Sequence, residues 1–515
     1  MNGSGETSKF TYDANGNLTG ATDAAGNRWS ADYSGAAAPA HITDPNGNVW
    51  TLKYDASGNP AAVQNPAGGG AAVTRSAAGL IASLTDGLGN KTSYQYNSDG
   101  LLTTFIDALN GTWTYQYDGA ANVSARTDPG GTVLKAAAPD LSGFERDSLN
   151  RLVSYTDSFG NQVGYQYDGA GQLTAMTLPG GKTVTYGYDH AHRLSMVSDW
   201  LGNFALYRYD AAGWPVSVSV SGGPVAIYQY DAGRRLRAIV STGPDGSPVA
   251  GYRYTLDANG NRTAVSALEP NTTKVTIAAY SFTLDAANHP VSRSDGQTYQ
   301  YDARGNLTAI QGSRNVTLGY DALGRLQSFN ADTSTSYSYD SAGLRSMRTV
   351  NGTGRRLVND PSGAVPRVVM ELDGSNAPVA WYVYGLGLLW KVTADGTAYF
   401  YHFDGDGNVV AVSNPTAGVV NQYRYDGAAV GRLVSANEGV ENMFRARGES
   451  GWMDDGDGLL FTGRAYQFPE LRLTLPAVAD PSPPTPRVLP EFSGAGACFL
   501  EGVAICRFAT GRRER

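Results

Sequence analysis

Polar and apolar residues alternate along many short stretches of this chain, and each stretch ends in a turn-forming phrase. Examples are "TYQYD" at 114–118, "VTYGYD" at 184–189, "LYRYD" at 206–210 and "IYQYD" at 227–231. Alternation with a period of two residues is typical of β-strands, so Tyr115 and Tyr117 are expected on one strand face. Helical periodicity is hard to find anywhere. The pattern predicts an all-β protein.

The turn-forming phrase is Tyr-Asp-x-x-Gly, as in "YDANGNL", "YDASGNP", "YDGAGQL", "YDAAGWP", "YDARGNL" and "YDALGRL". Tyr12, Tyr33 and Tyr54 begin successive units, so the period is about 21 residues. A second turn, such as "TDPNGN" or "TDSFGN", lies midway through each unit. One unit is therefore two strands and two turns, and an insertion at "DPGGTVLKAAAPDLSG" shifts the phase.

The chemistry of the phrase supports hairpins. An Asp carboxylate accepts backbone N–H groups two residues on, and Gly or Asn adopts positive φ. Tyrosines on neighbouring strands are expected in cross-strand ladders. The residues predicted to build the repeat are Tyr12, Asp13, Gly16, Tyr54, Asp55, Gly58, Tyr167, Asp168, Gly171, Tyr209, Asp210, Gly213, Tyr301, Asp302, Gly305, Tyr320, Asp321 and Gly324.

The phrase and its spacing resemble the RHS/YD-repeat family of bacterial toxin shells, whose repeats also occur in teneurins and in the shells of Tc toxin C-subunits. The resemblance covers roughly residues 8 to 470. It implies a spiral β-sheet wound into a hollow shell or part of one, closed by an RHS-associated core region. The resulting division is a YD-repeat shell at 1–350, a core region at 351–475, and a Pro-rich linker with a short degenerate tail at 476–515.

Composition narrows the possible partners and compartments. The net charge is −8 and no basic stripe precedes the C-terminal "GRRER", which disfavours a nucleic-acid partner. "NGSGETSK" after Met1 contains no apolar signal-peptide core, and no run approaches the roughly 18 apolar residues of a membrane helix. The two cysteines, Cys498 and Cys506, lie in the tail, so disulfides do not stabilise the repeats.

The stretch "GWMDDGDGLLFTGRAYQFPE" at 451–470 gathers Asp454, Asp455 and Asp457 between glycines. Neither it nor "DGDGNVVAVSNP" fits the ligand spacing of a calcium loop. His190 and His192 are the only close histidines, and they lack a third ligand. Turn-forming acids and an ordinary loop are the preferred interpretations, with no metal and no cofactor expected.

A carboxylate pair is the one catalytic option. Shells of this family resemble self-cleaving aspartyl proteases, with one aspartate after R-Y-Y and a second in D-P-x-G. Here Phe468 stands where the first aspartate is expected, and Asp480-Pro481 is followed by Ser-Pro. Asp480 is retained as a candidate catalytic residue, but the incomplete pair favours a protein that is not an enzyme.

The resemblance implies a non-enzymatic β-shell that encapsulates or presents a C-terminal effector. The short tail predicts a fragment lacking that effector. Two alternatives remain: a cell-surface carbohydrate-binding adhesin, and an autoproteolytic shell that uses Asp480. Expected partners are an encapsulated toxin segment, a neighbouring shell fragment, or surface glycans, with no membrane span. Family resemblance implies a secreted or cell-surface location.

Overall fold

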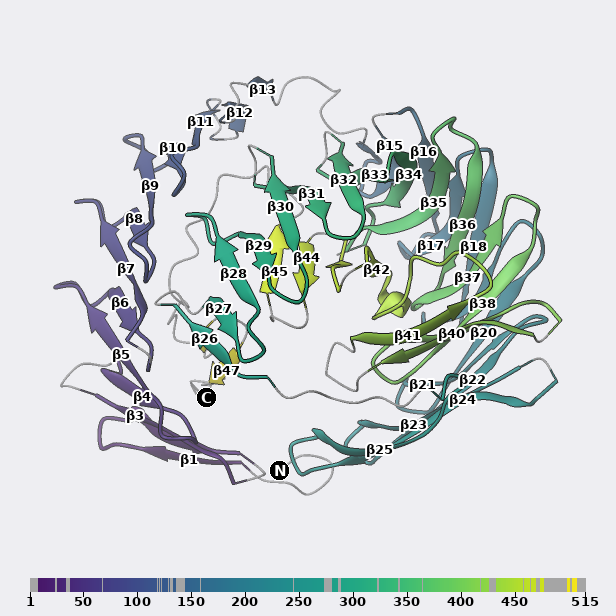
Figure 1. Ribbon diagram of the computed structural model, residues 1–515, viewed down its shortest axis with the longest axis horizontal. Coiled ribbons are helices and arrows are strands. Elements are labelled where there is room, and N and C mark those ends of the chain that lie inside the picture. The colour runs from purple at the N-terminus through teal and green to yellow at the C-terminus, as the bar shows by residue number, and fades with distance from the viewer. Residues whose placement is uncertain are drawn as a thin grey trace.

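A computed structural model places almost every strand beside its neighbours in sequence (Figure 1). The structure describes residues 8–476, except 24–25, 34–37, 67, 118, 120, 122, 128, 130–132, 136–143, 158, 244, 273–279, 286–288, 322–323, 341–342, 364, 417, 426–431, 457, 464 and 469–472, together with 498–500 and 503–506. These residues form antiparallel sheets of 13, 12, 16, 4 and 2 strands. The all-β prediction is confirmed, and none of the described part of the chain forms a helix long and apolar enough to span a membrane.

The first sheet contains β1 (Lys9–Tyr12), β2 (Leu18–Thr22), β3 (Arg28–Asp32), β4 (His41–Thr43), β5 (Val49–Tyr54), β6 (Pro60–Gln64), β7 (Gly70–Arg75), β8 (Ile81–Thr85), β9 (Lys91–Tyr96), β10 (Leu102–Ile106), β11 (Thr112–Tyr117), β12 (Val123–Thr127) and β13 (Val133–Lys135). The second contains β14 (Phe144–Arg146), β15 (Leu152–Thr156), β16 (Gln162–Tyr167), β17 (Leu173–Leu178), β18 (Lys182–Tyr188), β19 (Leu194–Ser198), β20 (Phe204–Tyr209), β21 (Pro215–Val220), β22 (Val225–Tyr230), β23 (Leu236–Thr242), β24 (Pro248–Leu256) and β25 (Arg262–Leu268). The insertion that shifts the repeat phase falls at the break between these two sheets.

The third sheet contains β26 (Phe282–Leu284), β27 (Pro290–Arg293), β28 (Thr298–Tyr301), β29 (Leu307–Gln311), β30 (Val316–Tyr320), β31 (Leu326–Asn330), β32 (Ser334–Tyr339), β33 (Arg345–Val350), β34 (Thr353–Asp360), β35 (Arg367–Asp373), β36 (Pro378–Tyr384), β37 (Leu388–Thr393), β38 (Ala398–Phe403), β39 (Val409–Ser413), β40 (Val419–Tyr425) and β41 (Leu433–Glu438). After it come the 3-10 helix η2 (Gly448–Ser450) and the short strands β42 (Met453–Asp454), β43 (Leu460–Phe461), β44 (Ala465–Phe468), β45 (Leu473–Pro476), β46 (Cys498–Leu500) and β47 (Val503–Cys506). The predicted boundary at 350/351 lies in the β33–β34 turn, inside the third sheet. The proposed domain division stays a prediction.

The turn chemistry of the repeat is visible in the unit at Asp168. Its backbone N–H donates to the carbonyl of Gln172 (3.0 Å), and Gly171 N–H donates to the Asp168 carbonyl (3.1 Å). Oδ1 of Asp168 accepts the N–H groups of Ala170 (2.9 Å) and Gln172 (2.8 Å). Gly171 has φ 83°, which an L-residue rarely adopts. Asp and Gly therefore have the turn-forming roles that the sequence predicts.

A β-bulge accompanies the Tyr-Asp turns, whereas most turns midway through the repeat units lack one, the β23–β24 turn being an exception. Between β16 and β17 the register shifts at Gln166/Tyr167, whereas β15 and β16 pair without a shift. The same shift recurs beside Tyr54, Tyr117 and Tyr209. A bulge bends its strand and increases the local twist. Bulges repeated at equivalent ends of the hairpins therefore curve the whole wall.

The repeat tyrosines fasten each unit to the one before it. In seven of the described units, the tyrosine hydroxyl donates to a backbone carbonyl 15 residues earlier, as from Tyr209 to Leu194 (2.6 Å) and from Tyr167 to Leu152 (2.8 Å). Such a bond contributes about 1 kcal/mol net. The other donors at this spacing are Tyr33, Tyr54, Tyr117, Tyr188 and Tyr230. Tyrosine contributes a defined hydrogen bond as well as ring packing.

The second and third sheets pack against each other, with the main hydrophobic core between them. Polar contacts join the two layers, including Tyr165 to Asp360 (2.7 Å) and Trp390 Nε1 to Asp199 Oδ2 (2.9 Å). Figure 1 shows the first sheet as a curved wall on the left, the two packed layers on the right, and β26–β31 in the middle. The first sheet has only smaller apolar clusters of its own.

Two turn-to-turn contacts link distant parts of this arrangement. Asn259 in the β24–β25 turn donates to Asp23 near the N-terminus (3.0 Å), and Arg304 in the β28–β29 turn forms an ion pair with Asp107. The lower end of the first sheet therefore meets the end of the second (Figure 1). The first and second sheets thus curve around strands β26–β31 of the third sheet.

Candidate functional site

The site that departs most from the repeat is where the closing segment, residues 442–468, lies on the third sheet. Its apolar side chains join the main core. Phe444 packs edge-on against Tyr382 (4.8 Å between ring centroids), Tyr466 against Tyr337 (5.1 Å), and Phe468 against Phe329 (6.0 Å). The segment is therefore anchored along its length by aromatic contacts with sheet residues.

A buried ion pair fastens the segment at its centre. Arg345, the first residue of β33, pairs with Asp455, and both side chains are 1% exposed. The Arg345 guanidinium also lies 3.9 Å from the ring centroid of Phe461. Arg348 approaches the same carboxylate from Nε (3.2 Å) and donates to the Asp455 carbonyl (3.1 Å). The carboxylate of Asp455 therefore faces two arginines from the sheet.

Asp454 points to a different partner. Its Oδ2 lies 3.5 Å from Arg445, and its Oδ1 accepts the Gly456 N–H (2.8 Å). Burial raises the pKa of Asp454, with Arg445 opposing the shift. Arg445 itself forms a bidentate pair with Glu438, at 2.9 Å for both contacts. Asp454 and Asp455, although adjacent in sequence, thus form ion pairs with different arginines.

A cavity of about 260 Å³ lies between the segment and the sheet. Among its lining residues, Lys391 is 3% exposed and Glu371 is 5% exposed. Burial lowers the pKa of Lys391 and raises the pKa of Glu371, whose carboxylate accepts the Tyr382 hydroxyl. Lys391 donates to the carbonyl of Glu441 in the chain leading to the segment. This chemistry is suited to holding the segment in place.

The turn interpretation of 451–470 needs revision at Asp455. Its backbone N–H closes a turn with Leu459 (2.9 Å), and Gly456 and Gly458 have positive φ, as expected for a turn. Its side chain, however, forms the buried bridge to Arg345. Arg345 was not among the residues predicted from the sequence; it lies in "GLRSMRTVNGTGRRL" at 343–357, where the regular repeat spacing ends.

The other candidates are dispersed. Phe468 is 1% exposed in the core, and Asp480, Pro481 and Asp457 lie outside the described residues. His192 occupies the positive-φ turn position (φ 61°) and its Nδ1 contacts the Gln172 amide oxygen (2.9 Å). The described ranges contain no group of three or more His, Cys, Asp or Glu arranged to hold a metal.

The repeat residues lie at the turns of all three sheets rather than in one site. Their acids accept the turn N–H groups, as at Asp13 (2.9 Å from Asn15 N), Asp55 (2.9 Å from Ser57 N), Asp210 (2.9 Å from Ala212 N), Asp302 (2.9 Å from Arg304 N) and Asp321 (2.9 Å from Arg325 N). Gly16, Gly58, Gly213, Gly305 and Gly324 have positive φ. Tyr301 and Tyr320 donate to Pro290 and Leu307 at shorter spacings than the regular units.

Fold and site together define a YD-repeat β-shell protein. A family model described as "RHS Repeat" matches residues 1–28, 39–69, 96–133, 146–183 and 167–203, and one described as "Teneurin YD-shell" matches residues 224–435. The chain belongs to the RHS/YD-repeat family.

Two nucleases named WapA are among the curated relatives. One is a tRNA3(Ser)-specific nuclease of Bacillus spizizenii, and the other a tRNA nuclease of Bacillus subtilis strain 168. Each is 26% identical over 256 residues, which is 47% of this chain and 10% of the relative. This chain therefore spans a small part of their length.

Solved structures share the fold. A crystal structure of TcdB2-TccC3 matches with a TM-score of 0.64 and 13% identity, covering 92% of this chain and 33% of that one. A Photorhabdus luminescens Tc holotoxin pore matches with a TM-score of 0.62 and 13% identity, covering 91% and 32%. The chain thus corresponds to about a third of those chains.

Proposed function

We propose that this chain is part of the β-shell of an RHS-type toxin, a shell that encapsulates or presents a C-terminal effector, and that the chain itself is a shell fragment without that effector. The observation that carries the proposal is the curved wall of successive hairpins, bent at each Tyr-Asp turn by a bulge. A wall with this repeated bend surrounds a volume instead of extending as a flat array. The likeness of fold to Tc toxin chains supports the same role.

The closing segment fits this function as an internal fastening. It follows the last strand of the third sheet and is held by aromatic contacts and a buried ion pair. Chain beyond it therefore starts from a fixed point on the shell wall. Secretion, a role in bacterial competition and binding of surface glycans rest on the family resemblance alone, and glycan binding is testable on a glycan array.

Protection of an added C-terminal epitope tests the proposal. Two versions of the full chain carry the same protease-sensitive epitope, one after Arg515 and the other in the β19–β20 turn beside Leu201, which is 51% exposed. Enclosure predicts that the C-terminal epitope is digested at least about tenfold more slowly, because cleavage requires exposure. Equal digestion rates at the two positions would contradict enclosure.

A further inference from the structure

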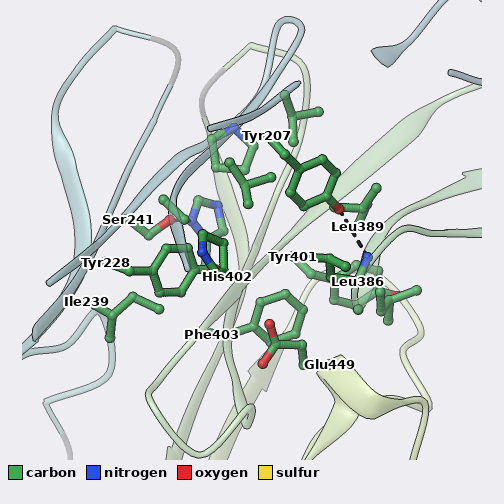
Figure 2. A pocket seen from close by; sticks show the side chains of 17 residues that line it. Tyr207, Tyr228, Ile239, Ser241, Leu386, Leu389, Tyr401, His402, Phe403 and Glu449 are labelled. Carbon is green, nitrogen blue, oxygen red and sulfur yellow. Dashed lines mark hydrogen bonds between the residues drawn. The ribbon is translucent and has the colours of Figure 1, made fainter. Parts of the chain in front are cut away.

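A second cavity, separate from the closing-segment ion pairs, lies between the two packed layers. Its volume is about 140 Å³, and it is lined by strands β20–β23 of the second sheet, by β37 and β38 with the turn before them, and by Glu449 of η2. Figure 2 shows the side chains of Tyr207, Tyr228, Phe403 and Glu449 around this space. The walls are mainly aromatic and aliphatic.

Glu449 is the only acidic residue in this lining. Its backbone N–H donates to the Gly407 carbonyl (3.1 Å), which fixes where its side chain starts. A Cβ on Gly387 would lie 2.6 Å from Cγ of Glu449, and one on Gly407 would lie 2.9 Å from Oε2. Because Gly387 and Gly407 have no Cβ, they leave space for the side chain of Glu449.

The carboxylate has no counter-charge among the residues that the structure describes. Neither an ion pair nor a hydrogen bond reaches it within that part of the chain. Burial and the negative charge of Asp404 raise the pKa of Glu449 to about 7. His402 supplies no charge, because burial lowers its pKa to about 4 and both ring nitrogens contact serine hydroxyls, Ser241 at 2.7 Å and Ser413 at 2.9 Å.

We propose that this cavity binds a small organic ammonium ion, with Glu449 as its counter-charge and the rings of Tyr207, Tyr228 and Phe403 as its walls. Aromatic faces attract cations, most strongly in sites shielded from water. A cavity of about 150 Å³ accommodates benzene, so one of 140 Å³ suits about six or seven heavy atoms. A hard metal ion is a poor fit because it needs several oxygen ligands and the lining offers one carboxylate. The inference does not depend on enclosure of an effector.

The charge of the ligand provides the sharpest test. Choline and its neutral analogue 3,3-dimethylbutan-1-ol have nearly the same shape, so their affinities for the full chain, measured by calorimetry at pH 8, differ mainly through charge. We expect choline to bind at least about tenfold more tightly. Equal affinities for the two compounds would overturn the proposal.

Variants test whether the preference for choline over the neutral analogue arises at Glu449. Glu449→Gln keeps the side-chain shape and is expected to reduce the choline preference to about twofold or less, whereas Glu145→Gln, on an exposed strand position, should leave it unchanged. Tyr228→Leu should weaken choline more than the neutral analogue. Retained preference in Glu449→Gln would contradict the assignment.

The source of the ammonium group is distinguished by a second probe. n-Butylammonium reproduces the end of a lysine side chain, whereas choline represents a free quaternary amine. Tighter binding of n-butylammonium assigns the site to a lysine of a bound polypeptide, and tighter binding of choline assigns it to a free ligand. Binding of neither probe above the neutral analogue would reject both sources.

Discussion

Removing either partner of the buried Arg345–Asp455 pair should release the closing segment from the third sheet. Both side chains are 1% exposed, so the remaining charge would be left in a nearly dry environment. Loss of one partner of a buried pair typically costs about 3–5 kcal/mol. Arg345→Met should lose a free energy near the lower end of this range, because Arg348, whose side chain is 26% exposed, still faces Asp455. Asp455→Leu should lose a free energy near the upper end of the range, because the buried guanidinium of Arg345 then loses its carboxylate partner.

Hydrogen exchange of the segment's backbone amides measures this release directly. The strands β43 and β44 should exchange faster in both single variants, and urea unfolding should show reduced stability. The double variant Arg345→Met with Asp455→Leu should recover most of the protection, because apolar residues can replace a buried ion pair at little cost. Arg355→Met is the matched control: its pair with Glu441 is 29% and 75% exposed and contributes less than about 1 kcal/mol.

Single variants that lose less than about 1 kcal/mol would refute this reasoning. A double variant no more stable than the weaker single variant would refute it as well, since the cost would then come from lost packing. Faster exchange spread over all three sheets would instead indicate that the pair supports the entire fold.

Three further predictions concern the repeat and the second cavity. Tyr209→Phe should cost about 1 kcal/mol in urea unfolding because a backbone carbonyl one unit earlier loses its donor, while Tyr12→Phe, 58% exposed, should change stability by less than about 0.5 kcal/mol. Gly171→Ala should cost about 1–2 kcal/mol because φ is +83°, whereas Gly164→Ala, which meets only ordinary contacts at 3.8 Å and beyond, should be nearly neutral. The pKa of Glu449 is about 7 in the folded chain, against an ordinary value of 4.5, so between these pH values the folded chain binds a proton that the unfolded chain has lost. The free energy of unfolding should therefore fall as pH rises from about 4.5 to 7, by at most about 3 kcal/mol. Glu449→Gln should flatten that slope.

The electrostatic surroundings of Glu449 support this direction of the pH dependence. The titratable groups that face it bring no positive charge near neutral pH: they are Asp404 from the β38–β39 turn, Tyr207 from β20, Tyr228 and Tyr230 from β22, and His402 from β38. A stability curve that rises between pH 4.5 and 7 in the wild type, and rises less in Glu449→Gln, would contradict the assignment.

The local fold was predictable from sequence because its causes are local. Asp168 caps its own turn within four residues, and Gly171 supplies the positive φ of the same turn. The phrase therefore predicts each hairpin without knowledge of the rest of the chain. The bond from Tyr209 to Leu194 spans 15 residues and depends on the register of the paired strands β19 and β20. The alternating pattern therefore predicted that the tyrosine ring packs on a strand face, but it did not predict which carbonyl accepts the hydroxyl.

The layered arrangement and the closing-segment site depend on contacts that periodicity does not encode. Tyr165 meets Asp360 across 195 residues, and Arg345 meets Asp455 across 110. Asp455 looked like a turn residue because its neighbours are glycines, and its backbone does form a turn. Its side chain is buried only because the segment returns to β33. A single arginine in a broken repeat gave no indication of that return.

The central claim is that the wall of hairpins surrounds an interior volume, and electron microscopy of the purified full chain tests it most directly. Class averages should show the first sheet as a curved wall, the packed second and third sheets as a thicker arc, and strands β26–β31 between them, as in Figure 1. A shell further predicts a region of low density between the wall and these central strands. A solid particle or a straight extended rod would contradict a shell.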